Sequence, residues 1–276
     1  MNQHSWLLLV IPVFAFGCAG PATRVPALPM PSQPHLSIMT YNVNFGMAGD
    51  TATVKAVAQQ DADVIFLQET TLAWEEALRG ELSETYPHMA FKQHPPAGGL
   101  AVLSKLPIES IDYLPAKSWF PAARVVLRSP VGRVQVLNVH LRPPASDRGN
   151  VLSGYFMTPP IRRQEISTFA AALDPDLPTL IVGDFNEGEH GRAVKWLNDH
   201  GYRSALPEFS PGAKTWRWHT SVGTLRGRYD HLCYDKRLTP LRVEVRDAGQ
   251  SDHLPVVGVF ALARDVLPTT RRSDQQ

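Results

Sequence analysis

Short apolar runs rich in β-branched residues alternate with amphipathic stretches along most of this chain. The runs predict strands, and stretches with apolar residues three or four positions apart predict helices. Strands are expected at residues 36–43, 63–67, 99–104, 108–114, 123–128, 133–140, 179–182, 228–234, 241–245 and 255–262. Helices are expected at residues 51–60, 71–85, 161–173 and 191–200.

Strands outnumber helices, and some neighbouring strands are separated only by a turn. Residues 129–132, Ser-Pro-Val-Gly, have the turn chemistry of a hairpin. This pattern favours an α/β fold in which two mixed β-sheets pack face to face with helices outside. The stretch 142–160 is polar and contains several prolines and glycines, so we expect a long loop beside the site.

Five of the apolar runs end in polar residues. Such a strand places its last residue at the rim of the sheet, and several strands side by side build a site there. The segments are Met39–Asn44, Val64–Glu69, Leu137–His140, Ile181–Asn186 and Ser251–Pro255. Their asparagines, carboxylates and histidines can together hold a divalent cation, bind a phosphate and move a proton. They therefore predict a hydrolase of phosphate esters.

Side chains two positions apart on a strand point to the same side. This alternation places three pairs on common faces: Asn42 with Asn44, Asn138 with His140, and Asp184 with Asn186. Glu69 follows a buried strand, where a lone carboxylate needs a cation or a hydrogen-bonding partner. It is the leading candidate for a metal ligand, and Mg²⁺ suits so oxygen-rich a set. The alternative is that Glu69 caps the helix that follows.

Carboxylates and histidines in the last two segments are candidates for acid–base chemistry. Asp184 can orient or deprotonate an attacking water, and Asn186 can donate to a phosphate oxygen. A polar turn is the alternative for this pair. Asp252 lies beside His253 and can raise its basicity and fix its orientation, although such a dipeptide is also common at surfaces.

Further basic and aromatic residues lie near these segments. Asp230 can support a site histidine or simply pair with Arg228. Trp216–His219 precede it and can wall a substrate cleft, or the tryptophans can belong to the core. Four arginines border the long loop and can bind a phosphate, although a solvated helix face also explains the last two: Arg142, Arg148, Arg162 and Arg163.

Composition is compatible with one large domain. The chain has 276 residues and 43% hydrophobic content, and the candidate site runs from Asn42 to His253, so a single fold must bring both ends together. The net charge of +1 provides no strong basic field for collecting nucleic acid. Of the two cysteines, Cys233 lies in a strand-like run, where a buried apolar role is expected.

The N-terminus predicts export. Residues 6–16 form an apolar run too short for a permanent membrane span, and the small residue before Cys18 resembles the lipobox of bacterial lipoproteins. We expect a signal peptide over 1–17, a lipidated Cys18 with a proline-rich tether over 18–35, a domain over 36–264 and a polar tail over 265–276. An ordinary cleaved secretory signal is the alternative. The expected location is the bacterial envelope, facing the periplasm or the exterior, or else the medium.

The segments, in their order, resemble the endonuclease/exonuclease/phosphatase superfamily, which includes nucleases, sphingomyelinases and inositol-polyphosphate phosphatases. The motifs are the asparagine-containing first strand, Gln68-Glu69, Asn138-Val139-His140, Gly183-Asp184-Phe185-Asn186, Tyr229-Asp230-His231 and Ser251-Asp252-His253. The resemblance implies a four-layer α/β sandwich and Mg²⁺-dependent hydrolysis, with Mn²⁺ as a possible substitute, by in-line attack of water.

The resemblance also implies roles for individual residues. Glu69 would bind the metal with help from Asn44, where some nuclease members carry aspartate. Asp230 would support a histidine, expected to be His140, and either Asp184 or His253 would be the general base. His253 would be oriented by its neighbour in sequence. The phosphate would be contacted by Asn42, His140 and Asn186.

We therefore expect a monomeric, lipid-anchored phosphodiesterase or phosphatase that acts on small phosphoesters or phospholipid headgroups. A deoxyribonuclease-like nuclease is the second hypothesis. A third is a member that binds a ligand without cleaving it, which the presence of Glu69, Asp184 and His253 disfavours.

Overall fold

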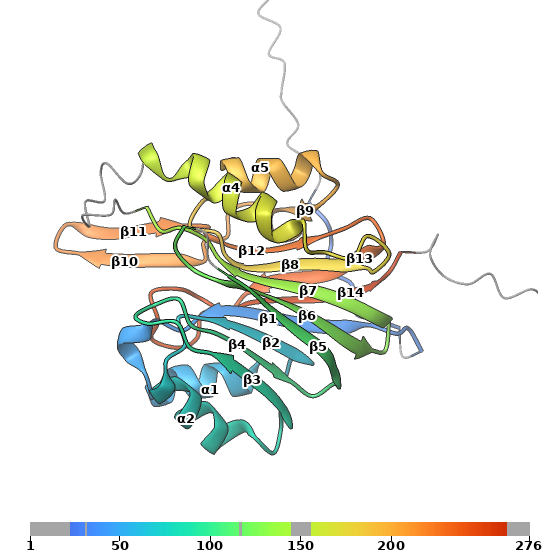
Figure 1. Ribbon diagram of the computed structural model, residues 1–276, viewed down its shortest axis with the longest axis horizontal. Helices are drawn as coiled ribbons and strands as arrows, with labels where there is room; N and C mark the ends of the chain where they lie inside the picture. Colours follow the sequence, from blue (N-terminus) through green and yellow to red (C-terminus); the bar gives the residue numbers. More distant parts are fainter. Residues whose placement is uncertain (1–22, 31, 116–117, 145–155, 264–276) are drawn as a thin grey trace, which may run out of the picture.

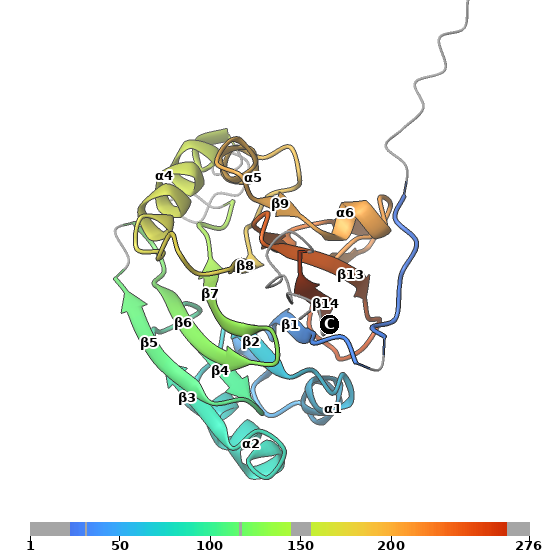
Figure 2. The ribbon, with the colours of Figure 1, turned by 90° about the vertical axis from the view of Figure 1, so that its right-hand side faces the viewer.

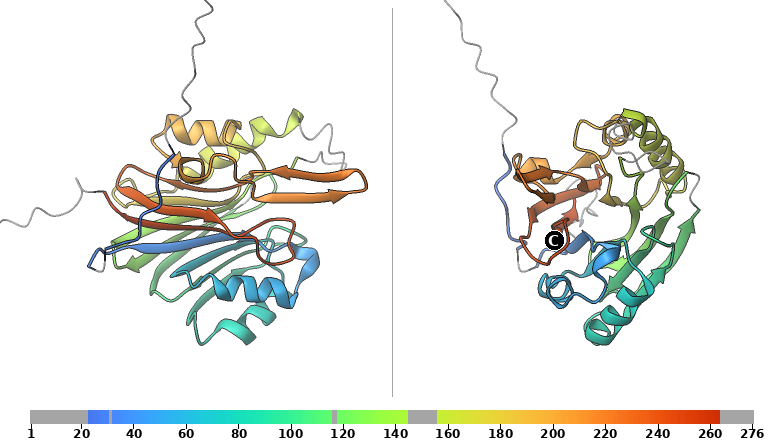
Figure 3. Two further views of the ribbon diagram at one scale, coloured as in Figure 1. Left: turned by 180° about the vertical axis from the view of Figure 1, so that it is seen from behind. Right: turned by 90° about the vertical axis from the view of Figure 1, so that its left-hand side faces the viewer.

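The computed structural model describes residues 23–30, 32–115, 118–144 and 156–263. Cys18, Arg148 and the predicted tail over 265–276 lie outside these ranges. Within them, two six-stranded mixed sheets pack face to face, with helices on both outer surfaces (Figures 1 and 3). The predicted α/β sandwich with two mixed sheets is therefore confirmed.

The first sheet has the strand order β13-β14-β1-β2-β4-β3. Its strands are β1 (Leu36–Asn42), β2 (Val64–Gln68), β3 (His88–Lys92), β4 (Leu100–Ser104), β13 (Leu238–Val245) and β14 (Val256–Leu262). Helices α1 (Thr51–Gln59) and α2 (Leu72–Leu82) lie on its outer face, at the bottom of Figure 1. β1 and β2 run parallel, which brings their carboxyl ends to one edge.

The second sheet has the order β5-β6-β7-β8-β12-β9. Its strands are β5 (Ile108–Leu114), β6 (Ala122–Ser129), β7 (Gly132–His140), β8 (Thr179–Asp184), β9 (Arg203–Ser204) and β12 (Asp230–Tyr234). Helices α4 (Pro159–Ala170) and α5 (Arg192–Asp199) cover its outer face, at the top of Figure 1. β7 and β8 are the parallel pair here.

Shorter elements complete the described fold. They are the 3₁₀-helix η1 (Phe45–Met47), helix α6 (Leu206–Phe209) and a separate hairpin of β10 (Trp216–Thr220) and β11 (Gly223–Gly227). The hairpin extends beyond the sandwich at the left of Figure 1. It was not expected from the sequence, and neither were β3, β9 and α6.

Alternation along the central strands explains the layers. In β2, Val64 and Phe66 belong to the core between the two sheets, whereas Ile65 and Leu67 pack against the helices. Because both faces of this strand are buried, it consists of an unbroken apolar run rather than an alternating one. A third apolar cluster fills the space between β7, β8 and the pair α4 and α5.

Part of the predicted tether lies against the domain. The backbone N–H of Arg24 donates to the carbonyl of Glu208 at 2.7 Å, and the N–H of Ala27 donates to Leu241 at 2.8 Å. The Arg24 guanidinium also pairs with the Glu208 carboxylate at 2.9 Å. Figure 2 shows this segment running past α6 and β13. Among the described helices, none has the length and apolar character needed to cross a bilayer.

Candidate active site

Strand pairing brings the predicted segments to one end of the sandwich. Asn42 and Gln68 are register partners at the ends of parallel β1 and β2, and His140 and Asp184 are partners at the ends of β7 and β8. β12 runs antiparallel to β8, so its first residue, Asp230, lies opposite Asp184. The carboxyl ends of the parallel strands therefore build the site, as expected for an α/β sheet.

Sharp turns follow three of these strands. Among the described residues, four that are not glycine have positive φ, and Asn44, Glu69 and Asn186 are three of them, at 62°, 62° and 52°. Such conformations are sparsely populated and cluster at functional sites. They also correct one prediction. The strands end before Asn44 and Asn186, so simple alternation does not place these side chains; instead their backbone N–H groups donate to Asn42 and Asp184.

Gly183 allows β7 and β8 to approach each other closely just before the turn at Asn186. It has φ of +132°, and a Cβ atom there would lie 1.9 Å from the carbonyl oxygen of Val139. Only glycine fits so close an approach between β7 and β8.

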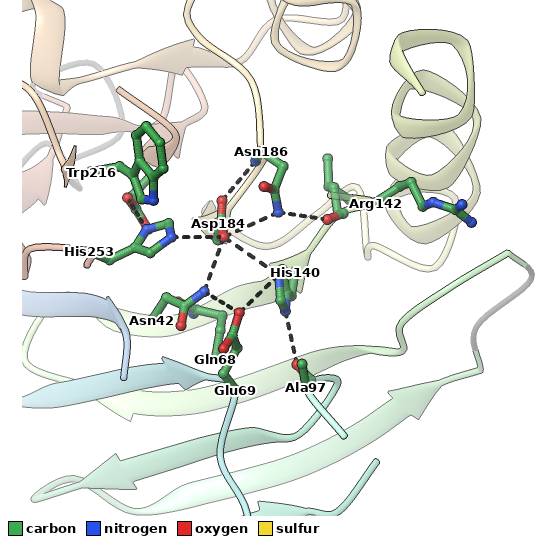
Figure 4. Close-up of polar contacts among 12 residues, drawn as sticks. Asn42, Gln68, Glu69, Ala97, His140, Arg142, Asp184, Asn186, Trp216 and His253 are labelled. Atoms are coloured by element: carbon green, nitrogen blue, oxygen red, sulfur yellow. Dashed lines mark hydrogen bonds and ion pairs between the residues drawn. The ribbon is translucent and has the colours of Figure 1, made fainter. Parts of the chain in front are cut away.

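Asp184 lies at the centre of the cluster (Figure 4). Its Oδ2 atom accepts from the side-chain amides of Asn42 at 3.1 Å and Asn186 at 3.2 Å. The Nε2 atoms of His140 and His253 each lie 3.5 Å from the same oxygen. Burial raises the pKa of the Asp184 carboxyl, while the two histidines act to lower it.

Glu69 lies beside this group and is only partly exposed. Its Oε1 atom accepts from Asn42 at 3.0 Å, and its Oε2 atom accepts from the backbone N–H of Phe45 at 3.1 Å. Burial raises its pKa, although both hydrogen bonds favour the charged form. The N-cap of α2 is Thr71, not Glu69, so the helix-capping alternative is wrong.

His140 is buried, and its ring is held on two sides. Nδ1 lies 3.2 Å from the carbonyl of Ala97, which leaves Nε2 facing the carboxylates of Asp184 and, at 3.8 Å, Glu69. Phe120 stacks on the imidazole with a centroid distance of 4.4 Å. Burial lowers the pKa of His140, which favours the neutral ring.

His253 is paired with Asp230, which corrects two predictions. Its Nδ1 lies 2.9 Å and 3.1 Å from the two carboxylate oxygens of Asp230. Asp230 was expected to support His140, and Asp252 was expected to orient His253. Burial lowers the pKa of His253, but the carboxylates of Asp230 and Asp184 outweigh that effect and raise it from 6.5 to about 10. His253 is therefore an imidazolium at neutral pH.

Asp252 has a different task from the predicted one. Its Oδ1 accepts from the Asn44 amide at 3.0 Å, and its Oδ2 accepts from the indole N–H of Trp216 at 2.9 Å. Asp252 acts on His253 only as a nearby charge that helps to raise its pKa. It ties the turn after β1 to the β10–β11 hairpin.

Two buried amides link the sheets below the site. Gln68 donates to the Oδ1 atom of Asn138 at 2.7 Å, and Asn138 donates to the carbonyl of Leu67 at 3.2 Å. The position of Asn138 was predicted from strand alternation, but its partner was not. Such a bond across the inner core ties β2 of the first sheet to β7 of the second.

Three of the four arginines that border the loop, Arg142, Arg162 and Arg163, lie in the described part of the chain. Arg162 is buried and pairs with Glu187 at 2.9 Å, and Arg142 packs 3.6 Å above the ring of Trp119. Arg163 lies on the exposed face of α4. Arg228 pairs with Glu189 rather than with Asp230. Buried salt bridges of this kind hold the outer helices, so the phosphate-binding prediction is not supported for Arg162.

The predictions for the two tryptophans and for Cys233 can also be compared with the structure. Trp216 lines a cavity over the carboxylates, and Trp218 is 55% exposed on the hairpin, so neither belongs to the core. Cys233 is buried, and burial raises the pKa of its thiol to about 12. It is an inert core residue, as predicted.

The cavity has a volume of about 520 Å³. Glu69, His140, Asp184 and His253 form its polar part, and aromatic and proline residues form much of the rest. Sequence reasoning missed the loop residues His94–Ala97 and Trp119–Phe120, because no local pattern shows that these loops meet the strand ends. The aromatic pair in a short loop was the one available signal.

Comparison with known proteins agrees with this geometry. One solved structure, an endonuclease/exonuclease/phosphatase from Beutenbergia cavernae DSM 12333, is 18% identical, with a TM-score of 0.68 over 84% of this chain and 72% of that one. D. rerio TDP2 complexed with single-strand DNA product is 15% identical, with a TM-score of 0.64 over 82% of this chain and 98% of that one. The human Nocturnin catalytic domain with bound sulfate is 17% identical, with a TM-score of 0.62 over 86% and 97%.

At these identities the structural matches establish the fold alone. A search of curated sequences gives no significant match. The sequence itself matches the Endonuclease/Exonuclease/phosphatase family over residues 39–253. This range is more than half of the chain and contains all the site residues from Asn42 to His253. The protein belongs to the Endonuclease/Exonuclease/phosphatase family.

Proposed function

We propose that this protein is a divalent-cation-dependent hydrolase of phosphate esters. The observation that carries the proposal is the buried Asp184 carboxylate, which two amides and two histidines from both sheets surround. Members of the family are hydrolases that act on phosphoesters, and this arrangement provides both phosphate donors and a group for the attacking water.

The residues fit a cation at Glu69. Burial raises the pKa of this carboxyl, so its charge is incompletely compensated by Asn42 and Phe45. A partly exposed carboxylate suits Mg²⁺, which keeps several waters and takes only one or two protein carboxylates, and it also suits Mn²⁺. When bound, such an ion would neutralise charge that develops on the phosphate oxygens.

A second acidic group is less suited to a cation. Ligand atoms of Asp184, Asp230 and His253 lie within 4.8 Å of one another. The imidazolium of His253 already lies between the two carboxylates and balances their charge. The amide of Asn44, the other predicted ligand, is directed to Asp252. We therefore assign the cation site to Glu69.

Protonation states suggest which group serves the attacking water. His253 is already charged at neutral pH and can only donate, so it suits binding of a phosphate oxygen or protonation of the leaving group. Asp184 can accept a hydrogen bond from water and orient it, and its raised pKa favours proton uptake. The side-chain amides of Asn42 and Asn186, which now donate to Asp184, supply N–H groups for the phosphate. His140, whose Nδ1 faces the Ala97 carbonyl, supplies one at Nε2 when its ring is protonated.

A small phosphoester or a phospholipid headgroup is the preferred substrate class. The net charge of +1 and the 520 Å³ cavity support this choice over a long polynucleotide. A nuclease is the second candidate, supported by the structural likeness to a TDP2 solved with single-strand DNA product. A lipid anchor at Cys18 and an envelope location are part of the proposal and rest on the N-terminal sequence.

A substrate panel tests the proposed function. The purified protein should cleave a chromogenic phosphodiester in Mg²⁺ and lose this activity in EDTA. His253→Ala, which removes the charged imidazole, should be at least about 100-fold slower. The other substrates are a phosphomonoester, sphingomyelin and plasmid DNA. Cleavage of plasmid alone would favour the nuclease, and an unaffected His253→Ala would contradict the assignment.

The pH dependence should identify the Asp230–His253 pair. The imidazolium exists below a pKa of about 10 and is lost above it, so its loss should appear as an alkaline limb in the wild-type kcat/KM. Asp230→Asn removes the largest charge that raises this pKa, and the alkaline limb should move down by about 1–3 pH units. Asp247→Asn removes an exposed carboxylate paired with Arg217 and is the matched control. An unchanged limb in Asp230→Asn would contradict the pairing.

A further inference from the structure

One side of the cavity is an apolar wall of four residues, Pro95, Pro96, Trp119 and Phe120. It comes from the β3–β4 and β5–β6 loops, which belong to different sheets. Phe45 and Trp216 line the same cavity from other segments. A polar catalytic group thus shares its cavity with several flat apolar side chains.

The wall is firmly built. Phe120 is 7% exposed, its ring stacks on His140 at 4.4 Å, and the ring of His94 meets its edge at a centroid distance of 6.3 Å. A Cβ on Gly98 would lie 2.5 Å from the Phe120 ring, so glycine is needed for this packing. The guanidinium of Arg142 lies 3.6 Å above Trp119, which restrains the indole.

The wall lies next to the proposed phosphate site. Phe120 is in direct contact with the imidazole whose Nε2 atom lies 3.5 Å from Asp184. A phosphate bound beside His140 would therefore have an aromatic surface next to it, with apolar space for a group on one of its ester oxygens. A cavity of about 520 Å³ has room for a ring there, within the usual range of about 300–1,000 Å³ for small-molecule sites.

Resting on the proposed function, we propose that this wall makes the enzyme selective for phosphodiesters that carry an aromatic ring on the ester oxygen that is not cleaved. Flat rings stack on aromatic side chains and bury apolar area, whereas a methyl group does neither. Trp119 is the residue that determines this selectivity. It contacts neither Asp184 nor Glu69 in the described structure and can be changed without touching the catalytic group.

Two diesters with one leaving group test the proposal: p-nitrophenyl phenyl phosphate and p-nitrophenyl methyl phosphate. In each reaction a water oxygen bonds to phosphorus, the bond to p-nitrophenolate breaks, and the water proton goes to the solvent. The substrates differ only in the group that stays. Dividing the ratio of their kcat/KM values by the ratio of uncatalysed rates removes their intrinsic difference in reactivity.

The wild type should prefer the phenyl ester by about tenfold or more after this correction. Trp119→Ala should reduce the preference by about 3–10-fold and leave the methyl ester nearly unaffected. Trp119→Phe, which keeps a ring, should restore most of it. Trp196→Ala is the control, because Trp196 is a half-buried tryptophan that stacks on His200 on α5, away from this cavity.

A corrected ratio near one in the wild type would overturn the inference and leave the proposed function intact. The same holds for a preference that survives Trp119→Ala. If neither ester were hydrolysed in Mg²⁺, the proposed function itself would fail. Thermal melting of each variant separates loss of selectivity from loss of fold, and the inhibition constants of phenylphosphonate and methylphosphonate measure the same preference without turnover.

Discussion

Replacing Asp184 with asparagine should lower kcat by about 10²–10⁴-fold, the usual contribution of a positioned acid–base group. The amide keeps the size of the side chain but cannot accept a proton from water. It also presents an N–H group toward Asn42 and Asn186, which now both donate to the carboxylate. Steady-state kinetics on a chromogenic diester measures the effect.

The comparison must separate chemistry from folding. Asp199→Asn is the matched control, since Asp199 is an exposed carboxylate on α5 that pairs with Lys195. It should retain full activity. Melting temperatures of both variants should remain near that of the wild type, because an amide is easier to bury than a charge. A folded Asp184→Asn with kcat within about threefold of the wild type would remove Asp184 from the reaction.

Glu69→Gln should abolish the response of the protein to Mg²⁺. A ligand at 100 times its Kd stabilises the folded state by about 2.7 kcal/mol, so saturating Mg²⁺ should raise the melting temperature of the wild type. The glutamine has no charge for the ion and should give the same melting temperature in Mg²⁺ and in EDTA. In EDTA it should melt no lower than the wild type, because the raised pKa shows that the buried carboxylate is unfavourable there.

This experiment does not depend on activity, which makes it a direct test of the cation site. Glu76→Gln, an exposed position on α2 close in sequence, should behave like the wild type. Activity of Glu69→Gln should fall in parallel with the loss of the Mg²⁺ effect. Equal stabilisation of Glu69→Gln and the wild type by Mg²⁺ would place the ion elsewhere.

The sequence predicted the strands that carry the site because their signal is local. β1, β2, β7 and β8 are apolar runs that end at Asn42, Gln68, His140 and Asp184, and pairing aligns these ends without further information. The family motifs added the four-layer architecture, which the structure confirms. The weakly patterned strands, such as β3 with its half-exposed residues, had no comparable signal.

Partner choice could not be predicted in the same way. Asp252 is adjacent to His253 in sequence, but Asp230 contacts it, because a backbone bridge between Trp216 and His253 sets the direction of that segment. Arg162 follows prolines in an amphipathic helix, and nothing local shows that Glu187 lies beneath it. Contacts between remote loops, including those of Trp119, depend on the assembled sandwich.

The hydrogen bonds that join Asn42 to Asp184 and His253 to Asp230 cross from one sheet to the other. Neither sheet alone provides all the groups of the site. The turnover rate therefore depends on how accurately the two sheets pack against each other. A shift of about 1 Å between them would cost about 100-fold in rate. Substitutions deep in the shared interior, at Phe260 or Val125, should thus resemble active-site lesions although they touch no reacting atom.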